Sequence, residues 1–352
     1  MQQRVTIKEL ETLITTIGET LTPIIQSEAG CGKTSLLKAI EKKEGDKYEY
    51  IYVDCPVKDM SDIAMTIPNH DTKTLENYVG SLFKLDSPKP KVILLDEFMK
   101  SPKLLQVIFT RLMLERTVGD TPLPEGSIVF GTSNNQADGL GDTMLAHAGN
   151  RVCILEMEKP QVEDWLVWAT ENGVSPLIRA FVHTFPRCLA SYRDSGQEDN
   201  PYIFNPKKPI LSFVSPRSLE KASVIVDNRD KLGDNATQVA LSGTIGASAS
   251  ADMSAFLRLE KELPTFEDIL KEPEKANMPD SISAQLMLMF QAVDKIKQQS
   301  DLTAFMKYIK RISSSEIQAI FFTMLMRNSK SVKIARGNKE ISDWAVENFN
   351  IM

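Results

Sequence analysis

Two hydrophobic patterns alternate along the first half of the chain and predict a parallel sheet covered by helices. Short apolar segments typical of buried strands lie at residues 23–26, 50–53, 92–95, 128–131 and 152–156. Stretches of helical periodicity separate them, and this alternation is typical of α/β proteins. Each of the strands carries a polar residue at its C-terminal end, where open α/β sheets bind their ligands. The N-terminus is itself amphipathic at helical spacing through Ile7, Leu10, Ile14 and Ile17.

A second pattern begins near Lys159-Pro160, where the strand signal fades and helical periodicity takes over. The helical stretches read QVEDWLVWATENG, SPRSLEKASVIVDNRD, SAQLMLMFQAVDKIKQQ and SEIQAIFFTMLMRN, and exposed loops are expected at residues 191–212 and 271–279. The Met-rich segments 286–290 and 317–326 are expected to form a helical core. The alternative is a surface that binds a partner protein. Trp165 and Trp168, three residues apart, are expected to pack the helical part against the sheet domain.

Composition narrows the class of protein. The chain has 352 residues, long enough for two packed units, with 42% hydrophobic and 25% charged residues. A net charge of −6 excludes a global cationic field for nucleic acid or anionic lipid. Neither a signal peptide nor a membrane-spanning run is evident, so we expect a soluble cytoplasmic protein.

The cysteines and histidines suggest neither a disulfide framework nor a metal site. Cys31, Cys55, Cys153 and Cys188 lie far apart without a C-x-x-C pair, as in a reduced cytosolic protein. Cys31 is expected to be a small turn residue, although a helix start can lower a thiol pKa and make it oxidisable. The histidines, His70, His147 and His183, lack the spacing of metal ligands.

A glycine-rich turn joins the first of these strands to a helix-forming stretch that begins at Ser35. Its residues are Ser27, Glu28, Ala29, Gly30, Cys31, Gly32, Lys33 and Thr34. Glycines let backbone N–H groups converge and a helix N-terminus adds partial positive charge, so this order predicts phosphate binding. We expect Lys33 to reach the β- and γ-phosphates and Thr34 to ligate Mg²⁺. Ser27 stands where the usual pattern has its first glycine.

Two carboxylates end the strand at 92–95. Asp96 is expected to enter the metal shell, and Glu97 to face a water in line with the γ-phosphate. After the strand at 128–131, Asn134 in the Ser133-Asn134-Asn135 sequence is expected to place an amide between the strand ends and orient that water. A turn and an acidic strand end together point to nucleotide hydrolysis.

The motifs SEAGCGKT, VILLDEF, SIVFGTSN, AGNRV and VSPRS, in this order, resemble the MoxR-like branch of the AAA+ ATPases, related to dynein-type AAA modules. The resemblance covers roughly residues 20–230. It implies an α/β fold, an AAA+ P-loop NTPase core whose parallel five-stranded sheet is sandwiched by helices. The implied domains are a core at 1–158, a helical lid at 159–280 and a C-terminal helical extension at 281–352.

The resemblance also assigns roles. Lys33 and Thr34 match the Walker A residues, Asp96 and Glu97 the Walker B pair, and Asn134 the sensor 1 residue. Arg151 takes the place of a finger that enters the neighbouring subunit's nucleotide, although Asn150 replaces the usual Asp before it. Arg217 looks like the sensor 2 arginine. Further arginines that could face a neighbour are Arg111 and Arg116.

Two segments match insertions of this branch: residues 59–78, in the place of the helix-2 insert, and residues 116–126, which read as a hairpin with a Gly-Asp turn. In related ATPases such insertions line a central pore or face a partner. Here they hold few basic or aromatic residues, which disfavours a pore that translocates nucleic acid.

The function implied is Mg²⁺-dependent ATP hydrolysis by a ring, expected to be a hexamer, that remodels a client protein. The resemblance further implies a partner with a von Willebrand factor A domain. ATP rather than GTP is also an expectation from the resemblance, because no residue is assigned to the base. Two alternatives stay open: a nucleic-acid motor or loader, and a nucleotide-gated scaffold that scarcely turns over.

Overall fold

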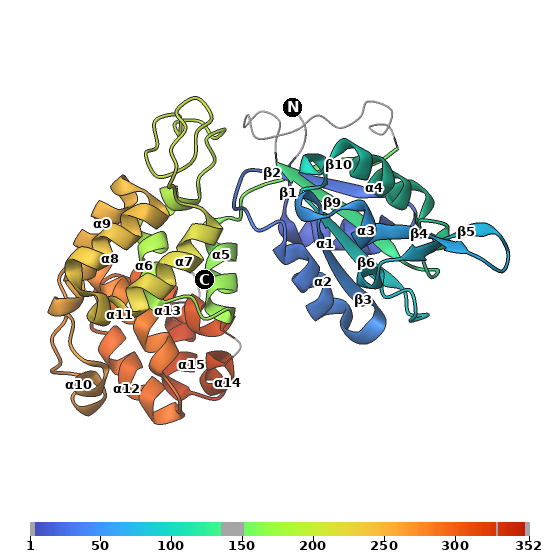
Figure 1. Ribbon diagram of the computed structural model, residues 1–352. Helices are drawn as coiled ribbons and strands as arrows, with labels where there is room; N and C mark the ends of the chain where they lie inside the picture. Colours follow the sequence, from blue (N-terminus) through green and yellow to red (C-terminus); the bar gives the residue numbers. More distant parts are fainter. Residues whose placement is uncertain (1–3, 135–150, 329, 349–352) are drawn as a thin grey trace. The chain divides into compact units, whose positions relative to one another are not determined.

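The computed structural model describes residues 4–134, 151–328 and 330–348, and the chain divides into two compact units, residues 1–160 and 161–352 (Figure 1). The first unit is built on a parallel sheet. Its main elements are β1 (Arg4–Val5), α1 (Ile7–Ile17), β2 (Pro23–Ser27), α2 (Ser35–Glu44), β3 (Glu49–Asp54), α3 (Met60–Ile63), β4 (Ala64–Asn69), β5 (Thr74–Val79), β6 (Lys91–Asp96), α4 (Lys103–Glu115), β7 (Thr117–Val118), β8 (Thr121–Pro122), β9 (Ile128–Asn134) and β10 (Cys153–Met157).

The sheet has the strand order β1-β10-β2-β9-β6-β3, and every neighbouring pair is parallel. The five predicted strands are all present. The sheet gains one more within the described residues, because Arg4–Val5 pairs with Glu156 and Met157 at its edge. This two-residue strand was not predicted, because the N-terminal sequence shows helical periodicity. The amphipathic helix begins just after it, at Ile7, with Thr6 and Glu9 forming a capping box.

Alternate residues of the strands enter two different cores. Val92 and Leu94 of β6 pack with α1 and α2, whereas Ile93 and Leu95 pack with α4 on the other face. Both faces are therefore covered, which explains why the strands read as continuous apolar runs. The predicted α/β class with helices on both faces of the sheet is confirmed.

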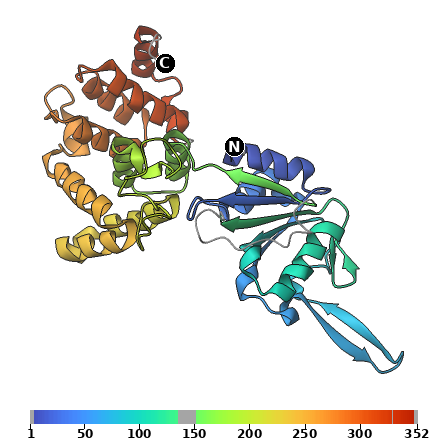
Figure 2. The ribbon, with the colours of Figure 1, turned by 90° about the horizontal axis from the view of Figure 1, so that it is seen from above.

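Two hairpins leave the sheet where insertions were expected. β4 pairs antiparallel with β5, and β7 pairs with β8 around Gly119 and Asp120. The β4–β5 hairpin extends well beyond the sheet of its unit (Figure 2). Gly119 has a φ of 59°, a conformation that glycine adopts without strain.

Among its described residues, the second unit has helices as its only regular secondary structure, and residues 190–215 form a long irregular loop. Its α-helices are α5 (Val162–Glu171), α6 (Pro176–Thr184), α7 (Pro216–Asp227), α8 (Arg229–Ile245), α9 (Ala247–Arg258), α10 (Phe266–Lys271), α11 (Ile282–Lys295), α12 (Gln299–Ile309), α13 (Ser315–Arg327), α14 (Ser331–Ala335) and α15 (Lys339–Glu347). No helix among the described residues is long and apolar enough to cross a membrane.

Two hydrophobic clusters fill this unit. One gathers α5 to α9 with part of α11, and the other gathers α10 to α15. Trp165 is 2% exposed in the first cluster, and Trp168 packs against the same cluster. Both tryptophans therefore contribute to the core of the helical unit itself.

Candidate nucleotide-binding site

The glycine-rich turn folds as the phosphate-binding loop that the sequence predicts. It leaves the buried end of β2 and enters α2, which begins at Ser35. Gly30 and Gly32 have φ angles of 76° and 92°, where a side chain would be strained. Ser35 Oγ donates to the Gly32 carbonyl at 2.6 Å, which closes the turn against the helix start. Ala29 lies in the turn, half-buried.

Lys33 turns back across the loop toward the neighbouring strand. Its Nζ donates to Asn134 Oδ1 at 2.8 Å, to Ser27 Oγ at 3.1 Å and to the Ser27 carbonyl at 3.3 Å. Ser27 is buried and pairs in register with Asn134 of β9. The serine that replaces a glycine thus fits here without displacing the lysine. The loop and the end of β9 form one polar cluster.

Asp96 joins this cluster from the carboxyl end of β6. Thr34 Oγ1 donates to Asp96 Oδ2 at 3.1 Å, and Thr132 Oγ1 donates to Asp96 Oδ1. β9 lies between β2 and β6, so the ends of the three strands meet at one edge of the sheet. The loop and the acidic strand end are therefore adjacent, as predicted from the sequence.

The donor set at this point suits a magnesium ion. Mg²⁺ prefers oxygen ligands in an octahedron at about 2.1 Å, and two neighbouring ligands are then about 3.0 Å apart. Thr34 Oγ1 and Asp96 Oδ2 are 3.1 Å apart. Within the described residues no three His, Cys, Asp or Glu side chains group around a metal position, so phosphate or water oxygens would complete the shell.

Glu97 presents its carboxylate beside this position. The residue has a φ of 49°, in the left-handed region, which turns the chain sharply out of β6. Its N–H donates to Thr132 Oγ1 at 3.1 Å, while Asn134 Nδ2 donates to Glu97 Oε1 at 3.3 Å. Lys100 Nζ lies 2.7 Å from Glu97 Oε2. The Glu97 side chain is 35% exposed, so water reaches it.

Three residues of the cluster were missed in the sequence. Thr132 bonds both Asp96 and Glu97, Tyr52 OH donates to Asp96 Oδ2 at 2.9 Å, and Lys100 pairs with Glu97. Burial, together with the hydrogen bond to Asp96, raises the pKa of Tyr52, so its hydroxyl stays a donor. A polar residue inside an apolar strand, as Thr132 is in β9, was the available signal.

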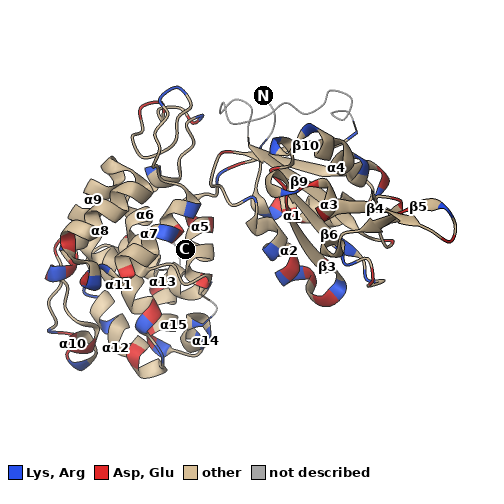
Figure 3. Cartoon of the chain, in the orientation of Figure 1, with Lys and Arg blue, Asp and Glu red and all other residues tan. Residues whose placement is uncertain are grey.

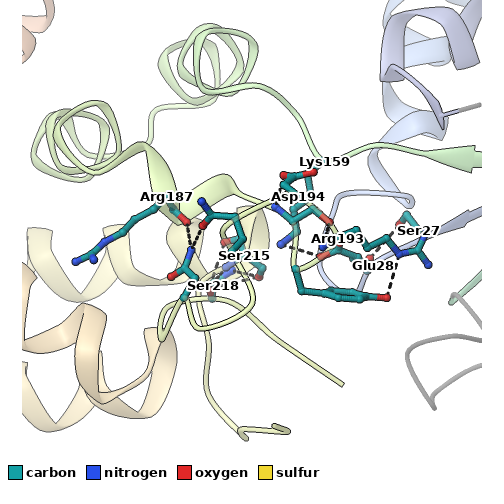
Figure 4. Close-up of polar contacts among 12 residues, drawn as sticks. Ser27, Glu28, Lys159, Arg187, Arg193, Asp194, Ser215 and Ser218 are labelled. Atoms are coloured by element: carbon teal, nitrogen blue, oxygen red, sulfur yellow. Dashed lines mark hydrogen bonds and ion pairs between the residues drawn. The ribbon is translucent and has the colours of Figure 1, made fainter. Parts of the chain in front are cut away.

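The second turn residue, Glu28, is anchored within its own unit. Its carboxylate lies 2.9 Å from Lys159 Nζ, and both side chains are more than nine-tenths buried (Figure 4). The neighbouring Cys31 is 4% exposed, and burial raises the pKa of its thiol to about 11. The suggestion that the helix start makes Cys31 easily oxidised is therefore wrong, because the desolvation of the thiolate outweighs nearby positive charge.

The candidate finger arginines differ in their surroundings. Arg151 is exposed just before β10, and Arg111 is exposed on α4, 2.7 Å from Glu115. Arg116 instead donates to the Gly18 and Glu19 carbonyls and to Thr22 Oγ1. Burial lowers the pKa of Arg116 to about 10, which still leaves it charged at neutral pH. These hydrogen bonds hold the Arg116 side chain against residues 18–22 of its own unit, so Arg116 is no longer a candidate for the finger.

Arg217 lies in the second unit and is exposed at the start of α7. Ser215 caps this helix by accepting from the N–H of Ser218, while the Ser218 hydroxyl accepts from the N–H of Ser215 (Figure 4). Asn135, Asn150 and His147 fall outside the described residues. The site roles assigned to Arg151 and Arg217 stay predictions.

A family profile described as viral superfamily 1 RNA helicase core domain matches residues 24–118, about a quarter of the chain. The matched segment includes the phosphate-binding loop and the Asp96-Glu97 pair. A comparison with curated proteins gives no match. The profile match and the cluster geometry agree on a nucleotide-binding core of the NTPase type.

Several solved structures are similar over most of the chain. A Holliday junction branch migration motor, RuvB of Thermotoga maritima, is 15% identical with a TM-score of 0.35, covering 76% of this chain and 75% of that one. A variant of the same RuvB is 15% identical with a TM-score of 0.37, covering 87% and 86%. NtrX of Brucella abortus is 12% identical with a TM-score of 0.33, covering 98% and 69%.

Replacing Thr132 with Val is expected to slow nucleotide hydrolysis about 10- to 100-fold, with a raised Mg²⁺ requirement. The change keeps the shape but leaves Asp96 Oδ1 and the Glu97 N–H without their shared partner, and losing such supporting bonds typically costs metal affinity or activity of this size. The measurement is hydrolysis rate against Mg²⁺ concentration. Thr110→Val on α4, whose hydroxyl donates to the Gln106 carbonyl of the same helix, is the control. An unchanged Mg²⁺ dependence in Thr132→Val would exclude this role.

Proposed function

We propose that this protein is a Mg²⁺-dependent ATP hydrolase of the AAA+ class, related to the MoxR-like branch. The observation that carries the proposal is the hydrogen bond from Thr34 to Asp96, with Lys33, Asn134 and Glu97 in the same cluster. A loop lysine, a hydroxyl, a strand-end carboxylate and a second carboxylate are the groups that triphosphate hydrolysis needs together.

In this proposal Lys33 neutralises the β- and γ-phosphate oxygens, and the backbone N–H groups around Gly30 and Gly32 bind the phosphates. Mg²⁺, held by Thr34 and Asp96, would supply further charge neutralisation at the phosphates. Glu97 accepts a proton from the attacking water, and Asn134 orients that water. Thr132 holds the Asp96 carboxylate and the backbone of Glu97, because its one hydroxyl bonds both.

We further propose that the active form is a ring, most simply a hexamer. Arg151 is exposed just before β10, which leaves it available to a neighbouring subunit's nucleotide. Arg217, exposed on α7, would report the nucleotide state to the helical unit. Hydrolysis would then change the position of the helical unit, and the ring would apply this movement to a client.

The client in this proposal is a protein. The β4–β5 hairpin offers apolar side chains to it, because Met65, Leu75 and Tyr78 are 51%, 72% and 56% exposed. The hairpin carries little charge (Figure 3), with Lys73 as its basic residue and Asp71 and Glu76 as its acidic ones. A partner with a von Willebrand factor A domain and a place in the reducing cytosol belong to the same proposal. All four cysteines are unbridged, in keeping with the latter.

The test is ATPase activity per subunit against protein concentration. If a neighbouring subunit supplies the finger, the rate per subunit should rise steeply as subunits assemble. Lys33→Ala is the negative control, because this variant should lose its affinity for the nucleotide. A concentration-independent rate would contradict the ring. The absence of turnover at any concentration would favour the nucleotide-gated scaffold instead.

A nucleic-acid motor is the second candidate, and the match to a viral helicase core favours it. The net charge of −6 and the weakly charged hairpin oppose it. Stimulation of the ATPase by DNA or RNA that falls as salt is raised would support the motor, because phosphate contacts release counterions. The same assay with a protein client but no nucleic acid distinguishes the two candidates.

A further inference from the structure

A pocket of about 400 Å³ opens within the helical unit, outside the candidate nucleotide site. It lies among α5, α6, α11 and α13, and its volume falls in the range of pockets that bury ligands, roughly 300–1,000 Å³. Its lining is mainly apolar and includes Leu166, Val167, Phe290, Ile320 and Met324. The Met-rich stretch around α13, expected in the sequence to be core, thus also reaches a surface.

The pocket is a groove between two helical stripes. On α5 the lining residues are spaced i, i+3, i+4 and i+7 from Glu163 to Thr170, and on α13 a matching stripe runs from Glu316 to Arg327. With a rise of 1.5 Å per residue, the α13 stripe is about 16 Å long, or three turns. The groove, which we call the α5–α13 groove, is therefore long enough for two to three turns of another helix.

Helix α13 carries apolar side chains on two faces. Ile317, Phe321 and Leu325 bury one face in the cluster of α10 to α15. Ile320 and Met324 form a second stripe that lines the groove. Both contact the hydrophobic clusters of the unit but stay only partly buried. A helix that is apolar on two faces needs burial on both, so the second stripe favours a partner.

The floor of the groove is neutral at physiological pH, whereas its rim is charged. Burial lowers the pKa of His183, with the opposing charge of Glu163 raising it less, and the His183 ring packs edge-on against Phe290. The side chains of the exposed rim residues Glu163, Glu316 and Arg327 form neither a hydrogen bond nor an ion pair with any described residue. The ionised rim therefore has an excess of one negative charge.

We propose that the α5–α13 groove binds an amphipathic helix of a partner protein that carries basic residues beside its apolar stripe. A segment placed on an apolar lining must satisfy its own backbone N–H and C=O groups, and a helix does so. Apolar side chains at i, i+3 or i+4 and i+7 fill the groove, and Lys or Arg meets the two free carboxylates. The proposal does not depend on the nucleotide chemistry.

The test selects helix-forming peptides from a random display library on the full-length protein and measures their affinity by fluorescence anisotropy. Peptides with apolar residues at helical spacing and an excess of Lys and Arg are expected. Ile320→Lys should weaken binding at least tenfold, whereas Met326→Lys, on α13 but outside the groove and 41% exposed, should not. Equal binding to both variants, or enrichment of acidic peptides, would overturn the proposal.

A second test uses two conservative substitutions that remove charge from the rim but are not expected to disturb the fold. Glu163→Gln with Glu316→Gln should weaken the selected peptides several-fold and reduce the salt dependence of binding. Glu267→Gln, which removes a carboxylate from the first turn of α10, is the matched control and should change neither. If the protein associates with itself and Ile320→Lys abolishes this association, the groove binds a second copy of the chain. That result would also reject a separate partner.

Discussion

Glu97→Gln is expected to bind ATP normally and to hydrolyse it about a hundred- to ten-thousand-fold more slowly, the usual contribution of a positioned general base. Glutamine keeps the shape and an oxygen that can accept from Asn134 Nδ2, which lies 3.3 Å from Glu97 Oε1. It cannot take a proton from water. The substitution is therefore expected to slow hydrolysis without weakening the binding of ATP.

The measurement pairs the affinity for a fluorescent ATP analogue with single-turnover hydrolysis. Glu41→Gln on α2 is the control, since it removes an exposed carboxylate that takes no part in the cluster. Wild-type turnover in Glu97→Gln would reject Glu97 as the base. Loss of ATP binding would show that Glu97 supports the loop rather than the water.

Arg151→Ala is expected to leave ATP binding by the isolated subunit unchanged and to lower the rate of the assembled form about 10³- to 10⁵-fold. This is the size of effect that an arginine finger typically has, because it stabilises the charge on the transferring phosphoryl group. The dependence of rate on protein concentration should become flat in the variant, although sedimentation still shows assembly.

Arg111→Ala gives the comparison for the same experiment. Arg111 is exposed on α4, with Glu115 and Asp120 as its acidic neighbours at 2.7 and 3.9 Å. If Arg111→Ala flattened the concentration dependence and Arg151→Ala did not, the finger would be Arg111. Arg116 is excluded from this comparison, because its hydrogen bonds to Gly18, Glu19 and Thr22 hold it within its own subunit.

The sequence predicted the sheet well because its strands are buried on both faces. Runs such as Val92 to Leu95 are apolar at every position, and polar residues mark where the strands end. The phosphate loop was equally visible, since positive φ angles at Gly30 and Gly32 require glycine. The edge strand Arg4–Val5 was missed, because two residues carry no periodicity.

Local patterns alone thus determined the α/β class, the phosphate loop, the acidic strand end and the helical second unit. The order of the strands depends on the tertiary structure. Because β9 lies between β2 and β6, the side chains of Thr34, Asp96, Glu97 and Asn134 come together. The same arrangement adds three residues to the cluster: Thr132, Tyr52 and Lys100. Packing also turned Arg116 inward and opened the groove beside α13. Periodicity reports which side of one element is buried, whereas contacts between distant segments depend on how the elements meet in space.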